Sequence, residues 1–244
     1  NFGSFSTGLI MIGSNLPKII ENITGTSEHW WCSRAIVIVA SAIVVLPAAF
    51  LKNIGSYAFL SFLFVMLLAG TCLIVTAYGV RTVVDDGTPN LSFFGPNVFY
   101  SIGGVSFAFV CHDISLSIAS ELKRCTRARW AWLTVCATGI TCVLFLLFGL
   151  FGHIYELKTE VNILDGLPSS GWLPTLARAM HCLAIVLTVP YVNFMPRLAV
   201  LLVIAHFFPA LSVTHRAREV QHYAVTVTIV AAGGGLAFLV TNLG

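Results

Sequence analysis

Seven long apolar stretches, separated by polar connections, dominate this sequence. They run roughly from Phe2 to Ile20, Ala35 to Leu51, Ile54 to Val80, Pro96 to Leu122, Trp130 to Gly152, Thr175 to Pro196 and Tyr223 to Leu243. A bilayer core about 30 Å thick needs about 20 mostly apolar residues per helix. The pattern therefore predicts an all-α, polytopic membrane protein with about seven transmembrane helices in one transmembrane domain, residues 1–244.

Composition excludes the common soluble classes. Only 9% of the residues are charged, whereas soluble domains carry about 25% and need them to coat a wet surface. The 13 Lys and Arg residues form no block that suggests a nucleic acid partner. The seven cysteines are scattered without paired spacing, so neither a zinc site nor a disulfide framework is indicated. No nucleophile with an attendant base and no phosphate-binding loop is present, so we expect neither an enzyme nor a bound cofactor.

The distribution of charge predicts the orientation. Eight basic residues fall in loops on one face and five on the other, and basic residues favour the cytoplasm. The richer face carries Lys52, Lys123, Arg124, Arg127, Arg129, Arg197, Arg216 and Arg218. Two glycosylation sequons, at Asn22 and Asn90, both fall on the poorer, non-cytoplasmic face. The apolar segment from Leu198 to Leu211 is expected to be an interfacial or cytoplasmic helix, because a span there would move Arg216 outside.

Several runs resemble the amino acid/auxin permease family, most closely its sodium-coupled neutral amino acid transporters. The runs are Leu16-Pro17-Lys18, Leu46-Pro47 with Leu51-Lys52, Phe107 to His112 with Glu121-Leu122, Leu187 to Pro190 with Pro196-Arg197, and Asn242 to Gly244. The chain departs from the family pattern in two places: Asp113-Ile114 follow the Cys-His pair, and Ala119 stands where a Tyr is usual.

The resemblance implies part of an inverted-repeat transporter fold of the APC type. On this reading the fragment covers the family's third to ninth helices and lacks the first two and the last two. The implied function is secondary active transport of neutral amino acids by alternating access, with sodium as the coupling ion. The partners are then a small amino acid and the lipid bilayer of a plasma, lysosomal or vacuolar membrane. Nothing indicates the oligomeric state.

A glycine-rich run precedes an aromatic run in the fourth stretch. Glycine weakens helical continuity, and backbone groups released at a break can bind a polar ligand where they face a cavity. We therefore expect a non-helical break between Ser101 and Cys111. The residues that we expect to bind substrate are Gly103, Gly104, Ser106, Phe107, Ala108 and Phe109. The alternative is a small-residue surface for close helix packing.

His112 and Asp113 are two ionisable residues in the same stretch. Intramembrane ionisable residues are functional candidates by default, and a histidine titrates near neutral pH. We therefore consider the pair a candidate pH sensor. The alternative is a structural pair near the inner end of the helix.

Thr188 lies two residues before Pro190, which has no N–H and leaves the Val186 carbonyl without its helical partner. A hydroxyl and freed carbonyls suit a hard cation, and Ala184 is small enough to leave room. The resemblance assigns the Thr in this setting a role in sodium binding, so Thr188, Ala184 and Val186 are the candidate sodium site. The alternative is that Thr188 bonds back to the Ala184 carbonyl, a common habit of Thr in helices.

Two rival functions remain open from the sequence. The first is a proton-coupled vacuolar or lysosomal amino acid carrier of the same family, in which a pH gradient replaces the sodium gradient. The second is an amino acid sensor or receptor, suggested by the number of spans.

Overall fold

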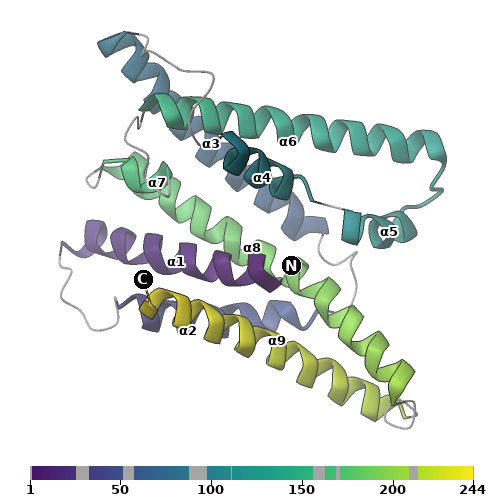
Figure 1. Cartoon of the computed structure of the whole chain (residues 1–244). Coiled ribbons are helices and arrows are strands. Elements are labelled where there is room, and N and C mark those ends of the chain that lie inside the picture. The colour runs from purple at the N-terminus through teal and green to yellow at the C-terminus, as the bar shows by residue number, and fades with distance from the viewer. Residues whose placement is uncertain are drawn as a thin grey trace. The chain divides into compact units, whose positions relative to one another are not determined.

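The computed structural model describes residues 2–25, 33–51, 58–87, 98–110, 112–155, 163–168, 171–208 and 214–243. Every regular element in these ranges is an α-helix (Figure 1). The helices are α1 (Phe2–Thr24), α2 (Arg34–Ala49), α3 (Ala58–Asp86), α4 (Val98–Ala108), α5 (His112–Glu121), α6 (Arg127–Tyr155), α7 (Ile163–Gly166), α8 (Trp172–Phe207) and α9 (His215–Leu243). The expected all-α architecture is confirmed.

The contacts group the chain into two compact units. Unit 1 comprises residues 1–71 and 167–244, and unit 2 comprises residues 72–166. Helix α3 begins in unit 1 and ends in unit 2. The single transmembrane domain expected over residues 1–244 stays a prediction.

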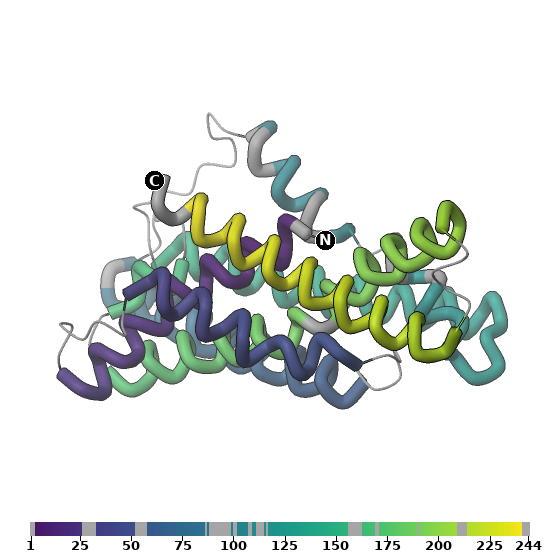
Figure 2. Tube along the Cα trace, turned by 90° about the horizontal axis from the view of Figure 1, so that it is seen from below, coloured from purple at the N-terminus to yellow at the C-terminus, as the bar shows by residue number. Residues whose placement is uncertain are grey.

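Unit 1 is built on four helices, α1, α2, α8 and α9, each of which contacts the other three. Figures 1 and 2 both show α2 running beside α1 and α9. The core of the bundle is apolar, and Phe5 and Leu9 of α1 pack there with Ile38 of α2 and Val230 of α9. The four helices of unit 1 therefore share one apolar core.

Gly233 of α9 lies at a close approach between α9 and α1. A Cβ added at Gly233 would overlap the ring of Phe5 on α1. The Ser6 hydroxyl donates to the Gly233 carbonyl across 3.2 Å. Glycine is therefore required here by the distance between the two helices.

Local signals explain where several helices begin and end. Gly25 has φ +71° and donates its N–H to the Glu21 carbonyl at 2.8 Å, which closes α1 in a conformation that favours glycine. Gly87, at φ +83°, ends α3 in the same way. At the start of α2, the Ser33 hydroxyl accepts the N–H of Ile36 at 3.4 Å, as an N-cap does.

In the described part of the chain, four helices are long and apolar enough to cross a bilayer: α3, α6, α8 and α9. Helix α2 is apolar but has 16 residues, or about 24 Å at 1.5 Å per residue. Helices α4 and α5 divide the fourth apolar stretch between them. Each of the seven expected stretches is therefore helical over most of its described length, and the protein is an integral membrane protein of several helices.

Helix α8 corrects one expectation. We expected the span to end at Pro196, followed by a separate interfacial helix, but α8 continues without a break through Pro196 to Phe207. Its 36 residues reach about 54 Å, well beyond the hydrocarbon core. A proline removes one helical hydrogen bond, which neighbouring helices can compensate. Arg197, expected in a loop, is instead buried among the helices of unit 1.

In unit 2, the second half of α3 lies close to α6. A Cβ at Gly79 would come within 2.6 Å of the Phe151 carbonyl oxygen, so glycine is required at this approach. The rings of Tyr78 and Tyr155 meet edge to face with centroids 5.5 Å apart. The Cys72 thiol donates to the Leu144 carbonyl at 3.5 Å.

Candidate functional site

The helix break falls between α4 and α5. Phe109 and Val110 are not helical, and α5 begins at His112. The two helices have 11 and 10 residues, so together they are about 31 Å long, close to the thickness of the hydrocarbon core. An interruption inside a helix of membrane length leaves backbone groups without helical partners, which lipid tolerates only where protein or a cavity meets them.

The break lies inside the expected interval, but the glycines do not cause it. Gly103 and Gly104 sit in the middle of α4, and a Cβ added at either position meets nothing within 4 Å. Ser106 is exposed. Phe107 and Ala108 form the end of α4, although their side chains lie outside what the structure describes.

Phe109 packs within unit 2. Its ring meets the ring of Phe145 on α6 edge to face, with centroids 5.5 Å apart. Its N–H donates to the Val105 carbonyl at 3.3 Å and closes the last turn of α4. Of the two interpretations left open by the sequence, this contact favours helix packing for the Phe109 ring, and it fixes the place of the break against α6.

The expected pH-sensing pair, His112 and Asp113, opens α5, which puts both residues directly after the break. The side chains of the pair lie outside the described atoms. The expected glycosylation site Asn90 is also outside the described residues. Asn22 is described, and its amide donates to the Thr175 hydroxyl at 3.2 Å.

The candidate sodium ligands lie on α8. The Thr188 hydroxyl donates to the Ala184 carbonyl at 2.9 Å, as the alternative interpretation expected. Ala184 is buried and Thr188 is half-buried. The hydroxyl oxygen that donates its proton keeps two lone pairs. The structure therefore brings two of the expected oxygens together, and Val186 lies between these two residues on the same helix.

Sequence reasoning missed His181, which lies seven residues before Thr188 and so on the same face of α8. Its Nδ1 atom is buried and has no hydrogen-bond partner in the described part of the chain. An ionisable residue in a span is a functional candidate, and that signal was available in the sequence. Ala177, Ala184 and Thr188 share this face, and the first two are small.

Two further buried polar contacts tie unit 1 together. Arg197 donates to the carbonyls of Ala49 and Leu51, at 2.5 and 2.8 Å, where α2 ends. His222 of α9 lies 3.1 Å from the Phe50 carbonyl through Nε2. The last carbonyls of a helix lack internal partners and carry a partial negative charge, so side chains from α8 and α9 hold the end of α2.

Arg178, near the start of α8, also binds backbone carbonyls through a buried guanidinium. It is 1% exposed and donates to the Leu167 carbonyl at 2.7 Å and to the Pro168 carbonyl at 3.3 Å. The contact fixes the segment that enters α8.

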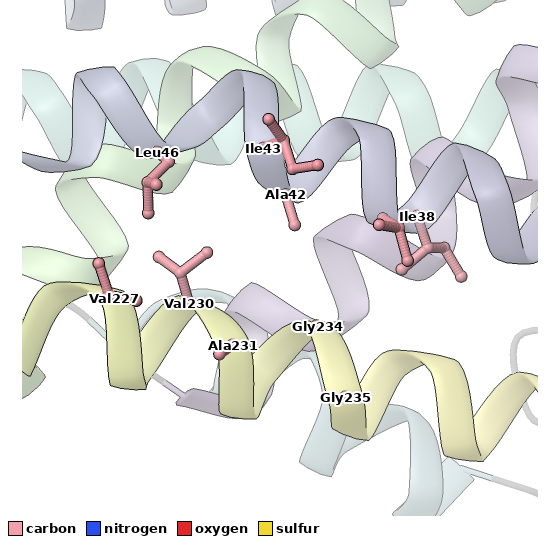
Figure 3. Close-up of a pocket in the computed structure, with 10 residues that line it drawn as sticks. Ile38, Ala42, Ile43, Leu46, Val227, Val230, Ala231, Gly234 and Gly235 are labelled. Atoms are coloured by element: carbon pink, nitrogen blue, oxygen red, sulfur yellow. The ribbon is translucent and has the colours of Figure 1, made fainter.

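Unit 1 also has two apolar grooves. One, of about 270 Å³, lies between α2 and α9 and is lined by Ala42, Leu46, Val230 and Gly234 among others (Figure 3). The other, of about 330 Å³, lies among α1, α2 and α8. Free amino acids need partners for a carboxylate and an ammonium group, which these linings do not offer, so neither groove fits such a ligand.

The family model described as "Transmembrane amino acid transporter protein" matches residues 1–244. The chain belongs to the transmembrane amino acid transporter family. Its members are carriers, in agreement with the expectation that the chain is not an enzyme.

Curated members of related proteins are also similar to this chain. It is 27% identical to "Putative sodium-coupled neutral amino acid transporter 11" of Rattus norvegicus, over 96% of this chain and 51% of the relative. The Bos taurus protein of the same name is 26% identical over 96% of the chain and 50% of the relative. "Vacuolar amino acid transporter 2" of Saccharomyces cerevisiae is 25% identical over 100% of the chain and 53% of the relative.

The chain thus spans about half the length of the curated relatives it matches. No solved structure matches it at a significant level.

Proposed function

We propose that this chain is part of a secondary active carrier that moves neutral amino acids across a membrane together with sodium. The observation that carries the proposal is the interruption of one membrane-length helix into α4 and α5 at Phe109 and Val110. Discontinuous helices near the bilayer midplane form the substrate sites of many transporters, because the half-helix ends offer N–H and C=O groups to a charged ligand. An amino acid needs both kinds of group.

The packing of unit 1 supports alternating access. The four mutually packed helices, with α2 held by Arg197 and His222, suit a body that moves as one. In the proposed cycle, one helix bundle rocks against the other around a fixed site. The proposed substrate residues are those of α4 that lead into the break, Gly103, Gly104, Ser106, Phe107 and Ala108, whereas the Phe109 ring packs against α6.

Sodium coupling is supported by the oxygens on α8. The Thr188 hydroxyl donates to the Ala184 carbonyl at 2.9 Å, and the hydroxyl oxygen keeps lone pairs that suit a hard cation. The mammalian relatives are named as sodium-coupled and as neutral amino acid transporters.

Proton coupling is the second candidate. One relative is named a vacuolar transporter, and His181 has a buried, unpartnered Nδ1 atom on the face of α8 that carries Thr188. His112 and Asp113 directly follow the break. These groups would bind a proton where sodium is absent, as expected for a vacuolar or lysosomal membrane.

Uptake by the complete protein in liposomes separates the two. One set of vesicles receives an inward sodium gradient at equal pH, and another receives an inward proton gradient in sodium-free potassium buffer. We expect labelled neutral amino acids to accumulate with sodium alone, and arginine or glutamate not to accumulate. Accumulation with the pH gradient alone would show that protons, and not sodium, are the coupling ion. No accumulation under either gradient would contradict a coupled carrier of neutral amino acids.

A further inference from the structure

The connection between α5 and α6 is strongly basic. Four basic residues occur within seven positions, Lys123, Arg124, Arg127 and Arg129. All four are exposed. The transport mechanism proposed above makes no use of them. We refer to residues 122–129 as the basic turn.

The backbone of the basic turn is compact. Arg124 has φ +53°, an uncommon conformation for a residue other than glycine, and the chain reverses there. The Thr126 hydroxyl accepts the N–H of Arg129 at 3.4 Å and caps the start of α6. The Arg129 guanidinium donates to the Lys123 carbonyl at 3.1 Å, so the two ends of the turn are tied together.

The bases have no acidic partner within the described structure. No carboxylate among the described residues forms an ion pair with the basic turn, unlike Arg81, which pairs with Asp85. The first turn of α6 also adds the positive end of the helix dipole. The basic turn is therefore a concentrated, uncompensated positive surface.

The residues that follow the basic turn are typical of a membrane interface. Helix α6 is apolar, and residues 131–140 are exposed along its length. Trp130 and Trp132 follow the basic turn directly, and Trp132 is 70% exposed. Tryptophan side chains favour the headgroup region, where the ring meets both lipid and water. The charge bias of the loops assigns this end of α6 to the cytoplasm.

We propose that the basic turn binds the head groups of anionic phospholipids in the cytoplasmic leaflet. Clusters of four or more basic residues next to a span bind such lipids through charge, and Arg is suited to phosphate oxygens because of its planar set of donors. Trp132 at the same level favours a lipid over a soluble phosphate or a phosphorylated protein. Binding holds the end of α5, the second half of the interrupted helix, at the membrane surface.

Lipid binding is tested on the complete protein, independently of transport. All tryptophans except Trp132 are replaced by Phe, and the protein is placed in phosphatidylcholine vesicles with a rising fraction of brominated phosphatidylserine. Bromine quenches a nearby indole, so half-maximal quenching reports lipid binding beside Trp132. The double variant Lys123→Gln with Arg127→Gln should reach half-maximal quenching only at about 30 times more phosphatidylserine. Each basic residue near the surface raises the affinity for anionic lipid roughly fivefold.

The matched control is Arg216→Gln with Arg218→Gln, which removes the same charge from an exposed segment on the same expected face. It should leave the quenching curve unchanged. Equal curves for the two double variants would overturn the proposal. Full reversal of the quenching by millimolar inorganic phosphate would also overturn it, because the basic turn would then bind soluble phosphate and not a lipid.

Discussion

The guanidinium of Arg197 on α8 donates to the backbone carbonyl of Ala49 on α2 at 2.5 Å. A second N–H reaches the Leu51 carbonyl, and the charge lies 5.4 Å from the centre of the Phe194 ring. Arg197 is 3% exposed. A buried cation without a carboxylate is held here by the carbonyl end of a helix and by an aromatic face.

Replacing Arg197 should therefore destabilise unit 1. Arg197→Ala removes two charge-assisted hydrogen bonds and leaves buried carbonyls unpaired, at a cost of roughly 2–4 kcal/mol. Arg197→Lys keeps the charge but cannot bind both carbonyls with a rigid fork, so its loss should be smaller. The melting temperature of the complete protein in detergent measures both.

Arg81→Ala is the control for Arg197, because Arg81 belongs to an exposed ion pair with Asp85 at 3.4 Å and such pairs contribute little. If the melting temperature of Arg197→Ala equals that of Arg81→Ala, the contacts of Arg197 do not stabilise the bundle.

Thr188→Ala should raise the sodium concentration for half-maximal uptake by roughly tenfold, the effect of losing one oxygen ligand to a cation. Thr188→Ser keeps the hydroxyl and should be mild. Thr226→Ala is the matched control, because the buried Thr226 hydroxyl makes the same back-bond, to the His222 carbonyl at 2.7 Å. If neither Thr188→Ala nor Thr226→Ala changes the sodium concentration for half-maximal uptake, the Thr188 hydroxyl only bonds back to its own helix and does not bind sodium.

Gly104→Leu should reduce transport more than tenfold with normal surface expression. A Cβ at this position meets no atom within 4 Å, so the fold has room for the larger side chain, whereas a substrate that approaches α4 does not. Gly139→Leu on α6 is the control, since its Cβ position is equally open. If Gly104→Leu transports as well as Gly139→Leu, the face of α4 that carries Gly104 is not part of the substrate site.

The predicted orientation places Asn22 and Cys125 on opposite sides of the membrane. Cys125 is a free, exposed thiol in the basic turn. In a variant with Cys125 as its one cysteine, an impermeant maleimide should label intact cells poorly and permeabilised cells well. With Ile23→Cys as the one cysteine, labelling should need no permeabilisation, because Ile23 is 73% exposed near the end of α1. The reverse pattern would invert the topology.

Much of the architecture could be predicted from the sequence because it depends on local properties. A run of apolar residues must become a helix in lipid, whatever its neighbours are, and each of the seven expected stretches is helical over most of its described length. The interval of the break was also predicted, although its exact place was not. Gly103 and Gly104 only lower helix stability, whereas the contact of Phe109 with Phe145 on α6 lies at the break itself.

The remaining features were decided by tertiary structure. Pro196 looked like the end of a span, but α8 continues past it, and the next residue, Arg197, is held by carbonyls 146 and 148 positions away in the chain. The sequence by itself determined that the chain is built of apolar helices of membrane length, and it predicted the break in the fourth stretch and a basic cytoplasmic side. Only the tertiary structure decided which helix ends the buried Arg197 and His222 would hold, because the partners of a buried cation are set by packing between distant segments and not by local composition.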